Sequence, residues 1–377
     1  MALINYLTRI HLADGVLEDA LGAEAEALGA KRPFLVTDRG LVESGLVERA
    51  LSALSPSLDV TIFTDTPSNP TEAAARQAAE LYRNEACDSL IGFGGGSCID
   101  LAKAVGILVT HNGPLADYAA IEGGVARIKD VLPPLIAIPT TAGTGSEVGR
   151  GTVIILDDGR KLGLLSPHLI PRVAICDPTL TLGLPPLLTA GTGMDALTHC
   201  IETYIATAYN PPADGIALDG LKRAAAHIER AVEKGTDLVA RREMMAAAMN
   251  GALAFQKGLG GVHAMSHGLA SVEGCDLHHG TLNAVLLPYV LDFNGPAVSH
   301  RYEDLALAMG LPANADLPNA VHRLNERLGL PARLGSMGVD EEAINIAAPL
   351  AEKDHTNGTN PRRATASDYQ KLMQAAL

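Results

Sequence analysis

The sequence predicts an α/β domain that binds a dinucleotide, followed by an all-helical domain that binds a metal. Three observations lead to this fold class. Short apolar runs alternate with Ala- and Leu-rich helical stretches until about residue 178, a glycine-rich turn follows one of these runs, and histidines at helical spacing gather in the second half. A chain of 377 residues is long enough for two domains. We place the boundary just before Pro185 and Pro186, which gives domains 1–184 and 185–377.

The first domain is expected to hold parallel strands joined by helices. The strand candidates are short apolar runs closed by Gly, Pro, Asp or Thr, and they cover residues 33–38, 59–65, 89–95 and 134–141. Segments 40–54 and 70–86 between them have helical composition, and this alternation is typical of a parallel sheet. Further strand-like runs continue to about residue 178, and helical periodicity dominates after Pro186.

Two polar loops directly follow strand candidates, GFGGGSCID (92–100) and PTTAGTGSE (139–147). The glycines allow a ligand to approach the backbone closely, and the helix that begins there presents free N–H groups to an anion such as a pyrophosphate. Loops at the carboxyl ends of neighbouring parallel strands face the crevice where open α/β sheets bind nucleotides. A tight turn without a ligand is the alternative interpretation of the glycine turn.

Asp38 ends the first strong strand candidate. A carboxylate at this position accepts hydrogen bonds from a ribose hydroxyl and repels a 2′-phosphate, so the sequence favours NAD over NADP. The alternative is an ordinary aspartate that caps a helix or a turn.

The second half contains two pairs of metal-binding residue types at i, i+4 spacing. Asp195 and His199 form one pair, His263 and His267 form the other, and His279 follows in the segment LHHG. This spacing places both members of a pair on one helix face. Carboxylate and imidazole suit a divalent transition metal, although core histidines satisfied by hydrogen bonds are the alternative. A metal beside a nucleotide crevice indicates hydride transfer at an alcohol or carbonyl polarised by the metal.

The composition excludes several other classes. The formal net charge of −14 and the absence of a Lys/Arg block argue against nucleic acid as a partner. We find no apolar window of 18 residues and no signal peptide, so no membrane partner is expected. The five widely spaced cysteines are typical of reduced thiols, which indicates a cytoplasmic protein that acts on a small molecule.

With these motifs in place, the whole chain resembles the iron-containing (group III) alcohol dehydrogenases. GGGSCIDLAK and PTTAGTGSEV resemble the two cofactor segments of this family, and DALTHCIE, HAMSH and HHG resemble its metal signatures, in the same order. The resemblance implies a fold like that of dehydroquinate synthase, NAD as cofactor and Fe²⁺ as metal, with Zn²⁺ as the alternative. It also implies a homodimer.

The resemblance assigns site residues position by position. The implied metal ligands are Asp195, His199, His263 and His279, and His267 matches a family histidine suited to proton relay. The implied cofactor-contacting residues are Asp38, Asn69, Gly95, Gly96, Ser97, Asp100, Thr140, Thr141, Thr144 and Lys161. Cys98 replaces a frequent proline at the start of a helix, where the helix N-terminus is expected to lower the pKa of the thiol.

Stretches such as TPSNPTEA, ILDDGRKLG and AFQKGLGGVH resemble the branch of the family that interconverts 4-hydroxybutyrate and succinate semialdehyde. Because such a substrate carries a carboxylate, we hypothesise that Lys257 or Arg150 pairs with it. Alternatively, both cations bind a carboxylate of the protein or the cofactor phosphate. The rival functions are an iron-type dehydrogenase of another small alcohol, diol or aldehyde, a lyase like dehydroquinate synthase, and a non-catalytic nucleotide-binding or metal-storage protein.

Overall fold

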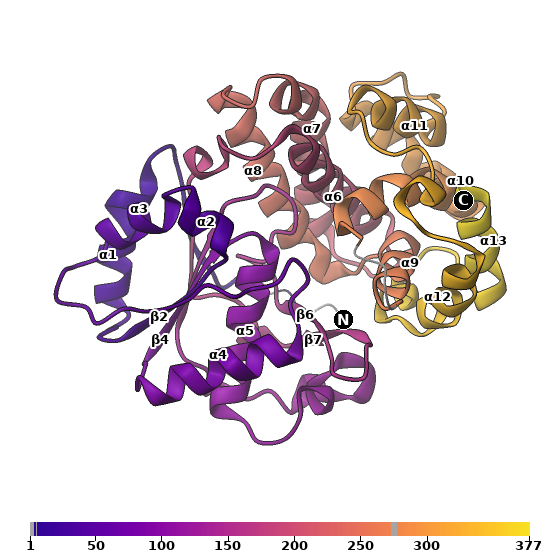
Figure 1. The fold of residues 1–377 in the computed structure, drawn as a ribbon. Coiled ribbons are helices and arrows are strands. Elements are labelled where there is room, and N and C mark those ends of the chain that lie inside the picture. Colours follow the sequence, from indigo (N-terminus) through magenta and orange to yellow (C-terminus); the bar gives the residue numbers. More distant parts are fainter. Residues whose placement is uncertain (1–3, 5, 273–276) are drawn as a thin grey trace. The chain divides into compact units, whose positions relative to one another are not determined.

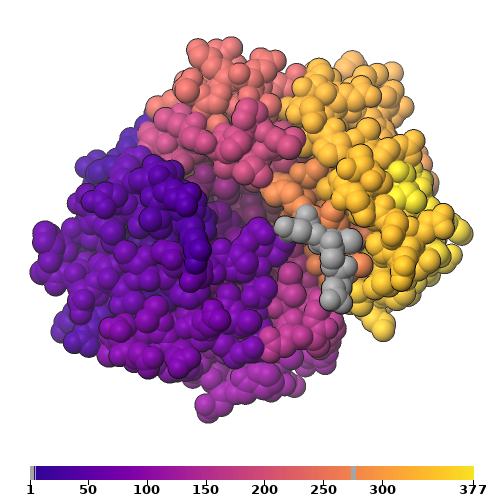
Figure 2. Space-filling model, viewed as in Figure 1, coloured from indigo at the N-terminus to yellow at the C-terminus, as the bar shows by residue number. Residues whose placement is uncertain are grey.

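The computed structural model describes residue 4, residues 6–272 and residues 277–377, and these form two compact units. The sheet unit contains the described residues from Tyr6 to Leu182 apart from the segment Ala142–Thr144. The helical unit contains Ile4, Ala142–Thr144 and the described residues from Gly183 to Leu377. Side chains fill the spaces that the ribbon leaves between the elements of each unit (Figure 2).

The sheet unit is built on a parallel sheet with strand order β1-β8-β5-β4-β2-β3. Its strands are β1 (Arg9–Leu12), β2 (Pro33–Val36), β3 (Thr61–Phe63), β4 (Ser89–Gly94), β5 (Leu135–Pro139) and β8 (Val173–Cys176). Its α-helices are α1 (Val16–Ala27), α2 (Arg39–Glu43), α3 (Leu46–Ser52), α4 (Glu72–Asn84) and α5 (Gly96–Thr110). The predicted α/β class is therefore confirmed for this part of the chain.

Helices cover both faces of this sheet, which explains why its central strands are apolar throughout (Figure 1). Leu35, Ile91 and Ile136 lie in register and pack with α1 and α3 in one core. The residue before each of them points to the other face, where Phe34, Leu90 and Leu135 pack with α4 and α5. The alternation of side chains along a strand thus serves two cores at once.

Two stretches differ from a simple alternation of parallel strands and helices. Of the three strand-like runs after residue 150, the last is β8 of the main sheet, and the first two form an antiparallel hairpin of β6 (Gly151–Ile155) and β7 (Lys161–Leu165) outside it. The link between them, residues 156–160, is too short for a parallel crossover. The expected helix over 40–54 is divided into α2 and α3, because Gly45 adopts a left-handed conformation with φ 78°. The edge strand β1 was not predicted.

The helical unit contains α-helices and 3₁₀ turns, as predicted for the second half. Its α-helices are α6 (Pro186–Ile205), α7 (Pro211–Glu233), α8 (Leu238–Ala254), α9 (Gly261–Ala270), α10 (His279–Ala308), α11 (Leu317–Arg327), α12 (Glu341–Lys353) and α13 (Ala366–Ala376). Helix α6 is buried on all sides from Thr189 to Ile205 and packs against α7, α8 and α10. Helix α9 packs against α10, α12 and the 3₁₀ turn η8 (His355–Thr359).

Four described cysteines are free thiols, and Cys275 lies outside the described residues. None of the helices in the described residues combines the length and the apolar composition that a membrane span requires.

Candidate active site

Three helices of the helical unit bring the predicted metal ligands together. Helix α6 carries Asp195 and His199, α9 carries His263, and α10 begins at His279. The Oδ1 atom of Asp195 lies 3.7 Å from His199 Nε2, 3.7 Å from His263 Nε2 and 3.6 Å from His279 Nε2. One carboxylate oxygen thus faces three imidazole nitrogens.

The donor types of these four side chains suit a divalent metal, and three of them lie close enough together to share one. Bonds of about 2.1 Å in a tetrahedral arrangement place neighbouring donor atoms about 3.4 Å apart, close to the spacing found here. Donor atoms of Asp195, His263 and His279 all lie within 4.8 Å of one another. Asp195, His199 and His263 are buried, so water does not compete freely for these donors.

The glycine of the segment HHG allows this approach. A side chain at Gly280 would place its Cβ 2.1 Å from the carbonyl oxygen of Gly191 and 3.1 Å from Cβ of Asp195. The start of α10 therefore rests directly on α6, and any residue larger than glycine would push His279 away from Asp195.

The charge states of Asp195 and His199 also suit a cation. Burial raises the pKa of Asp195, but attraction to His199, His279 and His263 lowers it well below the ordinary value, so this carboxyl stays ionised. Burial lowers the pKa of His199 to about 4, which leaves its imidazole neutral with a lone pair for a metal. Burial lowers the pKa of His263 as well, but hydrogen bonds to Asp195 and Glu202 raise it to about 9. Without a cation this imidazole is therefore protonated, and it releases the proton when it binds a metal.

Glu202 holds the His263 ring in place. Its carboxylate lies 2.7 Å from His263 Nδ1 and accepts hydrogen bonds from the backbone N–H groups of Gly260 (3.1 Å) and Val262 (2.7 Å). This contact directs Nε2 of His263 toward Asp195, as in the carboxylate–histidine–metal arrangement of many metal sites. Sequence reasoning missed Glu202, although its position seven residues after Asp195 places it on the same face of α6.

His267 lies beside the ligand cluster. Its ring stacks on that of His279 with centroids 5.6 Å apart, and its Nδ1 lies 3.0 Å from Asp354 Oδ2. Burial raises the pKa of Asp354, but His267 and His355 together lower it below the ordinary value. His355 stacks on the other side of His267 with centroids 6.0 Å apart. Asp354 and His355 lie far from His267 in sequence, so no spacing pattern could have identified them.

Lys257 lies away from solvent and is already paired. Its ammonium donates to the carbonyl oxygen of Tyr204 at 2.8 Å and forms an ion pair with Asp214. The Lys257 side chain is fully buried. These contacts agree with the alternative given for Lys257, a pairing with a carboxylate of the protein. By contrast, Arg150 is exposed, and its guanidinium has no partner among the described residues.

In the sheet unit, the two predicted cofactor loops leave adjacent strands. The glycine turn (within residues 92–100) follows β4, and the threonine loop (residues 139–147) follows β5. The N–H of Thr140 donates to the carbonyl oxygen of Gly94 at 3.0 Å. Gly95 caps α5 and Gly96 begins it, so the free N–H groups of the first turn lie in this loop. The side chain of Thr141 lies beside Gly95. Thr144 belongs to the helical unit.

Two residues of α5, Lys103 and Asp100, anchor the threonine loop. The buried Lys103 ammonium donates to the carbonyl oxygens of Ser146 (2.7 Å), Gly149 (2.9 Å) and Gly151 (2.7 Å). The Asp100 carboxylate accepts from the Ser146 hydroxyl at 2.5 Å and from the Val153 N–H at 2.9 Å. The contacts shown for Asp100 are thus with the protein itself. Lys103 was not singled out in the sequence, since a lone lysine in a helix carries no signal of burial.

Asp38 serves as a helix cap, the alternative considered for it. Its Oδ1 accepts from the N–H of Leu41 at 3.0 Å, and the Cys98 thiol lies 3.6 Å from its Oδ2. The expectation of a lowered thiol pKa was wrong, because burial and the Asp38 carboxylate raise the pKa of Cys98 well above its ordinary value. Asp38 lies two residues after the end of β2, which pairs with β4 in the sheet.

Two further predicted residues meet across the sheet unit. Lys161 on β7 donates to Asn69 Oδ1 at 2.9 Å, although the two are far apart in sequence. The Ser97 hydroxyl donates to the carbonyl oxygen of Ser68 at 2.5 Å and so fixes the segment SNPT beside the glycine turn. Asn69, Lys161 and Ser97 therefore share one polar region of the unit.

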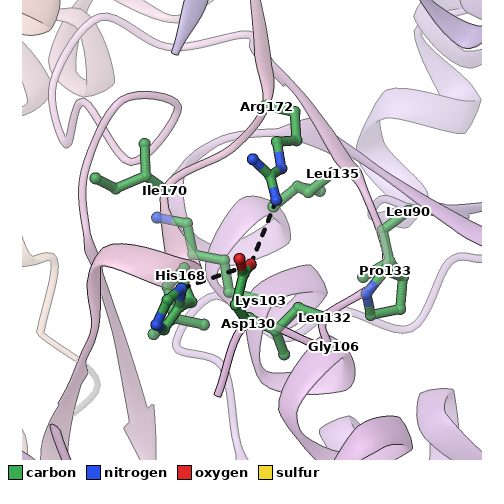
Figure 3. Close-up of a pocket in the computed structure, with 11 residues that line it drawn as sticks. Leu90, Lys103, Gly106, Asp130, Leu132, Pro133, Leu135, His168, Ile170 and Arg172 are labelled. Carbon is green, nitrogen blue, oxygen red and sulfur yellow. Dashed lines mark hydrogen bonds and ion pairs between the residues drawn. The ribbon is translucent and has the colours of Figure 1, made fainter. Parts of the chain in front are cut away.

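A separate small pocket lies in the sheet unit (Figure 3). Asp130 and Lys103 are among the residues that line it. The Asp130 carboxylate lies 3.5 Å from the His168 ring nitrogen Nδ1 and 3.4 Å from the Arg172 guanidinium. None of the predicted cofactor or metal residues lines this pocket.

Comparison with known families decides the classification. The model of the iron-containing alcohol dehydrogenases matches residues 8–178, and the model of the C-terminal region of the same family matches residues 189–377. The chain belongs to the iron-containing alcohol dehydrogenase family. Membership confirms the predicted enzyme class, a metal-dependent alcohol oxidoreductase that acts on a small molecule.

Individual family members are similar over their whole length. The chain is 55% identical to 4-hydroxybutyrate dehydrogenase of Cupriavidus necator, with 100% of both chains covered. A crystal structure of 1,3-propanediol oxidoreductase superposes with a TM-score of 0.93 at 35% identity, covering 100% of both chains. Sulfoacetaldehyde reductase from Bifidobacterium kashiwanohense, solved in complex with NAD⁺, gives a TM-score of 0.87 at 29% identity, covering 100% of this chain and 99% of that chain. These findings support NAD as the cofactor of this iron-containing alcohol dehydrogenase.

Proposed function

We propose that the chain interconverts 4-hydroxybutyrate and succinate semialdehyde with NAD, at a metal held by Asp195, His199, His263 and His279. The observation that carries this proposal is the buried cluster of one ionised carboxylate and three imidazoles. The full-length similarity to 4-hydroxybutyrate dehydrogenase of Cupriavidus necator supports the choice of substrate. Fe²⁺ is the expected metal, and Zn²⁺ suits the same donors.

The donor set favours dehydrogenase chemistry. When bound, the metal supplies Lewis acidity to the substrate hydroxyl and NAD accepts the hydride. The residues Asp38, Asn69, Gly95, Gly96, Ser97, Asp100, Thr140, Thr141, Thr144 and Lys161 remain the proposed cofactor-binding set. Within it, Gly95 and Gly96 offer backbone N–H groups to a pyrophosphate, whereas the contacts of Asp100 give it a supporting role.

We assign His267 the removal of the alcohol proton. Asp354 holds Nδ1 of His267 at 3.0 Å, which leaves Nε2 as the ring nitrogen that exchanges a proton. Asp354→Asn removes the negative charge that orients His267, so we expect a lower kcat and a displaced pH profile of kcat. An unchanged pH profile would contradict this role, even if kcat fell.

For the substrate carboxylate, Arg150 and Lys257 are the two candidates, and their surroundings differ. The Lys257 ammonium already pairs with Asp214, whereas Arg150 has no partner among the described residues. We therefore expect Arg150→Ala to lower kcat/KM for 4-hydroxybutyrate about 10- to 100-fold more than for 1-butanol. We expect Lys257→Ala to lower both by the same factor. The reverse pattern would assign the anchor to Lys257.

The experiment that tests the function is NADH formation at 340 nm with iron-loaded protein. We expect a clear preference for 4-hydroxybutyrate over 1,4-butanediol. Equal or better turnover of the diol would keep the reaction class and overturn the substrate. No turnover of any alcohol would favour the rival functions, a lyase or a non-catalytic protein.

Two further expectations accompany this function. We propose a cytoplasmic homodimer, on the basis of the family resemblance and the widely spaced cysteines. Light scattering of the purified chain tests the dimer, and a monomer mass at micromolar concentration would contradict it.

A further inference from the structure

Asn283 faces the proposed metal centre without being one of its ligands. It lies on α10 one turn after His279, and its side chain is fully buried. Its amide nitrogen Nδ2 lies 2.7 Å from Asp195 Oδ1, 3.3 Å from His263 Nε2 and 3.2 Å from His279 Nε2. One side chain thus contacts three of the four proposed ligands.

The chemistry of this contact is specific. Asp195 Oδ1 accepts hydrogen bonds, as do the imidazole nitrogens in their metal-binding form, and such acceptors repel one another when no cation lies between them. The Asn283 amide has two N–H donors, one for the Asp195 carboxylate and one for an imidazole nitrogen of the metal-free cluster. The strongest bond is the shortest one, from Nδ2 to the Asp195 carboxylate.

The other end of the same amide is unsatisfied. Asn283 Oδ1 is buried and has no hydrogen-bond partner among the described residues. A buried carbonyl oxygen without a partner costs stability, typically about 1–3 kcal/mol. An apolar residue would avoid this cost, so packing alone does not account for an asparagine here.

We propose that Asn283 is a positioning residue of the metal centre, which fixes the Asp195 carboxylate between the imidazoles and thereby sets the affinity for the metal. Partners that orient metal ligands typically change metal affinity about 10- to 100-fold when they are removed. This inference rests on the proposed ligand set, and it extends that set to a residue that touches its members but does not coordinate.

Asn325 provides a matched control. It is also buried, its Oδ1 also lacks a partner among the described residues, and its Nδ2 donates one hydrogen bond, to the carbonyl oxygen of Ala284 at 2.7 Å. Ala284 is the neighbour of Asn283 on α10. Replacing either asparagine by leucine exchanges a buried amide in contact with α10 for an apolar side chain of similar volume. Only Asn283 contacts the proposed metal ligands.

The test measures Zn²⁺ binding to the metal-free full-length chain by competition with a chromophoric chelator. We expect Asn283→Leu to raise the Kd for Zn²⁺ about 10- to 100-fold and Asn325→Leu to leave it unchanged. We also expect the visible absorption of bound Co²⁺ to change in Asn283→Leu alone. If Asn283→Leu does not fold, Asn283→Ala takes its place in both measurements.

The outcomes separate this inference from the function proposed above. An unchanged or lower Kd in Asn283→Leu would overturn it, and so would an equal rise in both variants. Failure of the wild-type chain to bind Zn²⁺, or binding that survives His263→Ala, would instead overturn the ligand set. Neither readout depends on which alcohol the enzyme oxidises.

Discussion

Glu147 offers a prediction whose magnitude can be worked out from its surroundings. It ends the loop that follows β5, and only 2% of its surface is exposed. Burial raises the pKa of its carboxyl from 4.5 to about 7, although the Lys103 ammonium works in the opposite direction. The folded chain therefore holds a proton on Glu147 between pH 4.5 and 7 that the unfolded chain releases.

The sign of the pH dependence follows from this difference. Because the folded state binds the extra proton, the contribution of Glu147 to stability is complete below pH 4.5 and is lost as the pH rises through 7. A difference of about 2.5 pH units at about 1.4 kcal/mol per unit gives a loss of about 3.5 kcal/mol in the free energy of unfolding.

Glu147→Gln replaces the protonated carboxyl by a neutral group of the same shape. We expect the variant to match the wild type near pH 4.5 and to be more stable by about 3.5 kcal/mol near pH 8. Urea unfolding at intervals between these values measures the difference, and titrating groups that do not interact with Glu147 cancel in the comparison. Glu80→Gln, on the exposed side of α4, controls for the loss of one surface carboxylate. A stability difference that stays constant with pH would refute the reasoning.

Three other predictions concern the two units. Glu202→Gln weakens the hold on His263, so the Kd for Zn²⁺ should rise about 10- to 100-fold in chelator competition, and an unchanged Kd would contradict this. Lys103→Met leaves three carbonyl oxygens without their donor and should lower the free energy of unfolding by about 3 kcal/mol or more in urea, so a loss below about 1 kcal/mol would be inconsistent. Removal of the metal with EDTA should abolish NADH formation and lower the thermal midpoint, and Fe²⁺ should restore both. Full activity in EDTA would exclude a metal-dependent reaction.

The metal-binding residues of the helical unit could be predicted because residues one helical turn apart are close together in the sequence. Asp195 and His199 lie one turn apart on α6, so their common face follows from the sequence alone. The same reasoning placed the glycine turn at the end of a strand, where β4 gives way to α5. The apolar runs likewise predicted strands, because a strand that is buried on both faces consists almost entirely of apolar residues.

Local patterns failed where the partner comes from a distant part of the chain. Lys257 was one of two candidates for the substrate carboxylate, with a carboxylate of the protein as the alternative, and only the fold shows that Asp214 lies beside its ammonium. The thiol of Cys98 begins a helix, yet burial and Asp38 decide its pKa. In both cases the deciding charge lies more than 40 residues away in the sequence.

The family, the fold class and the residue types able to hold a metal could be predicted from the sequence, because these depend on composition, order and spacing. The groups that orient the metal-binding side chains became known only from the folded chain. Glu202 on α6 reaches His263 on α9, and Asn283 reaches Asp195 across the contact of α10 with α6 at Gly280. Such contacts depend on helix packing, and no periodicity along one segment records which face of another segment it will meet.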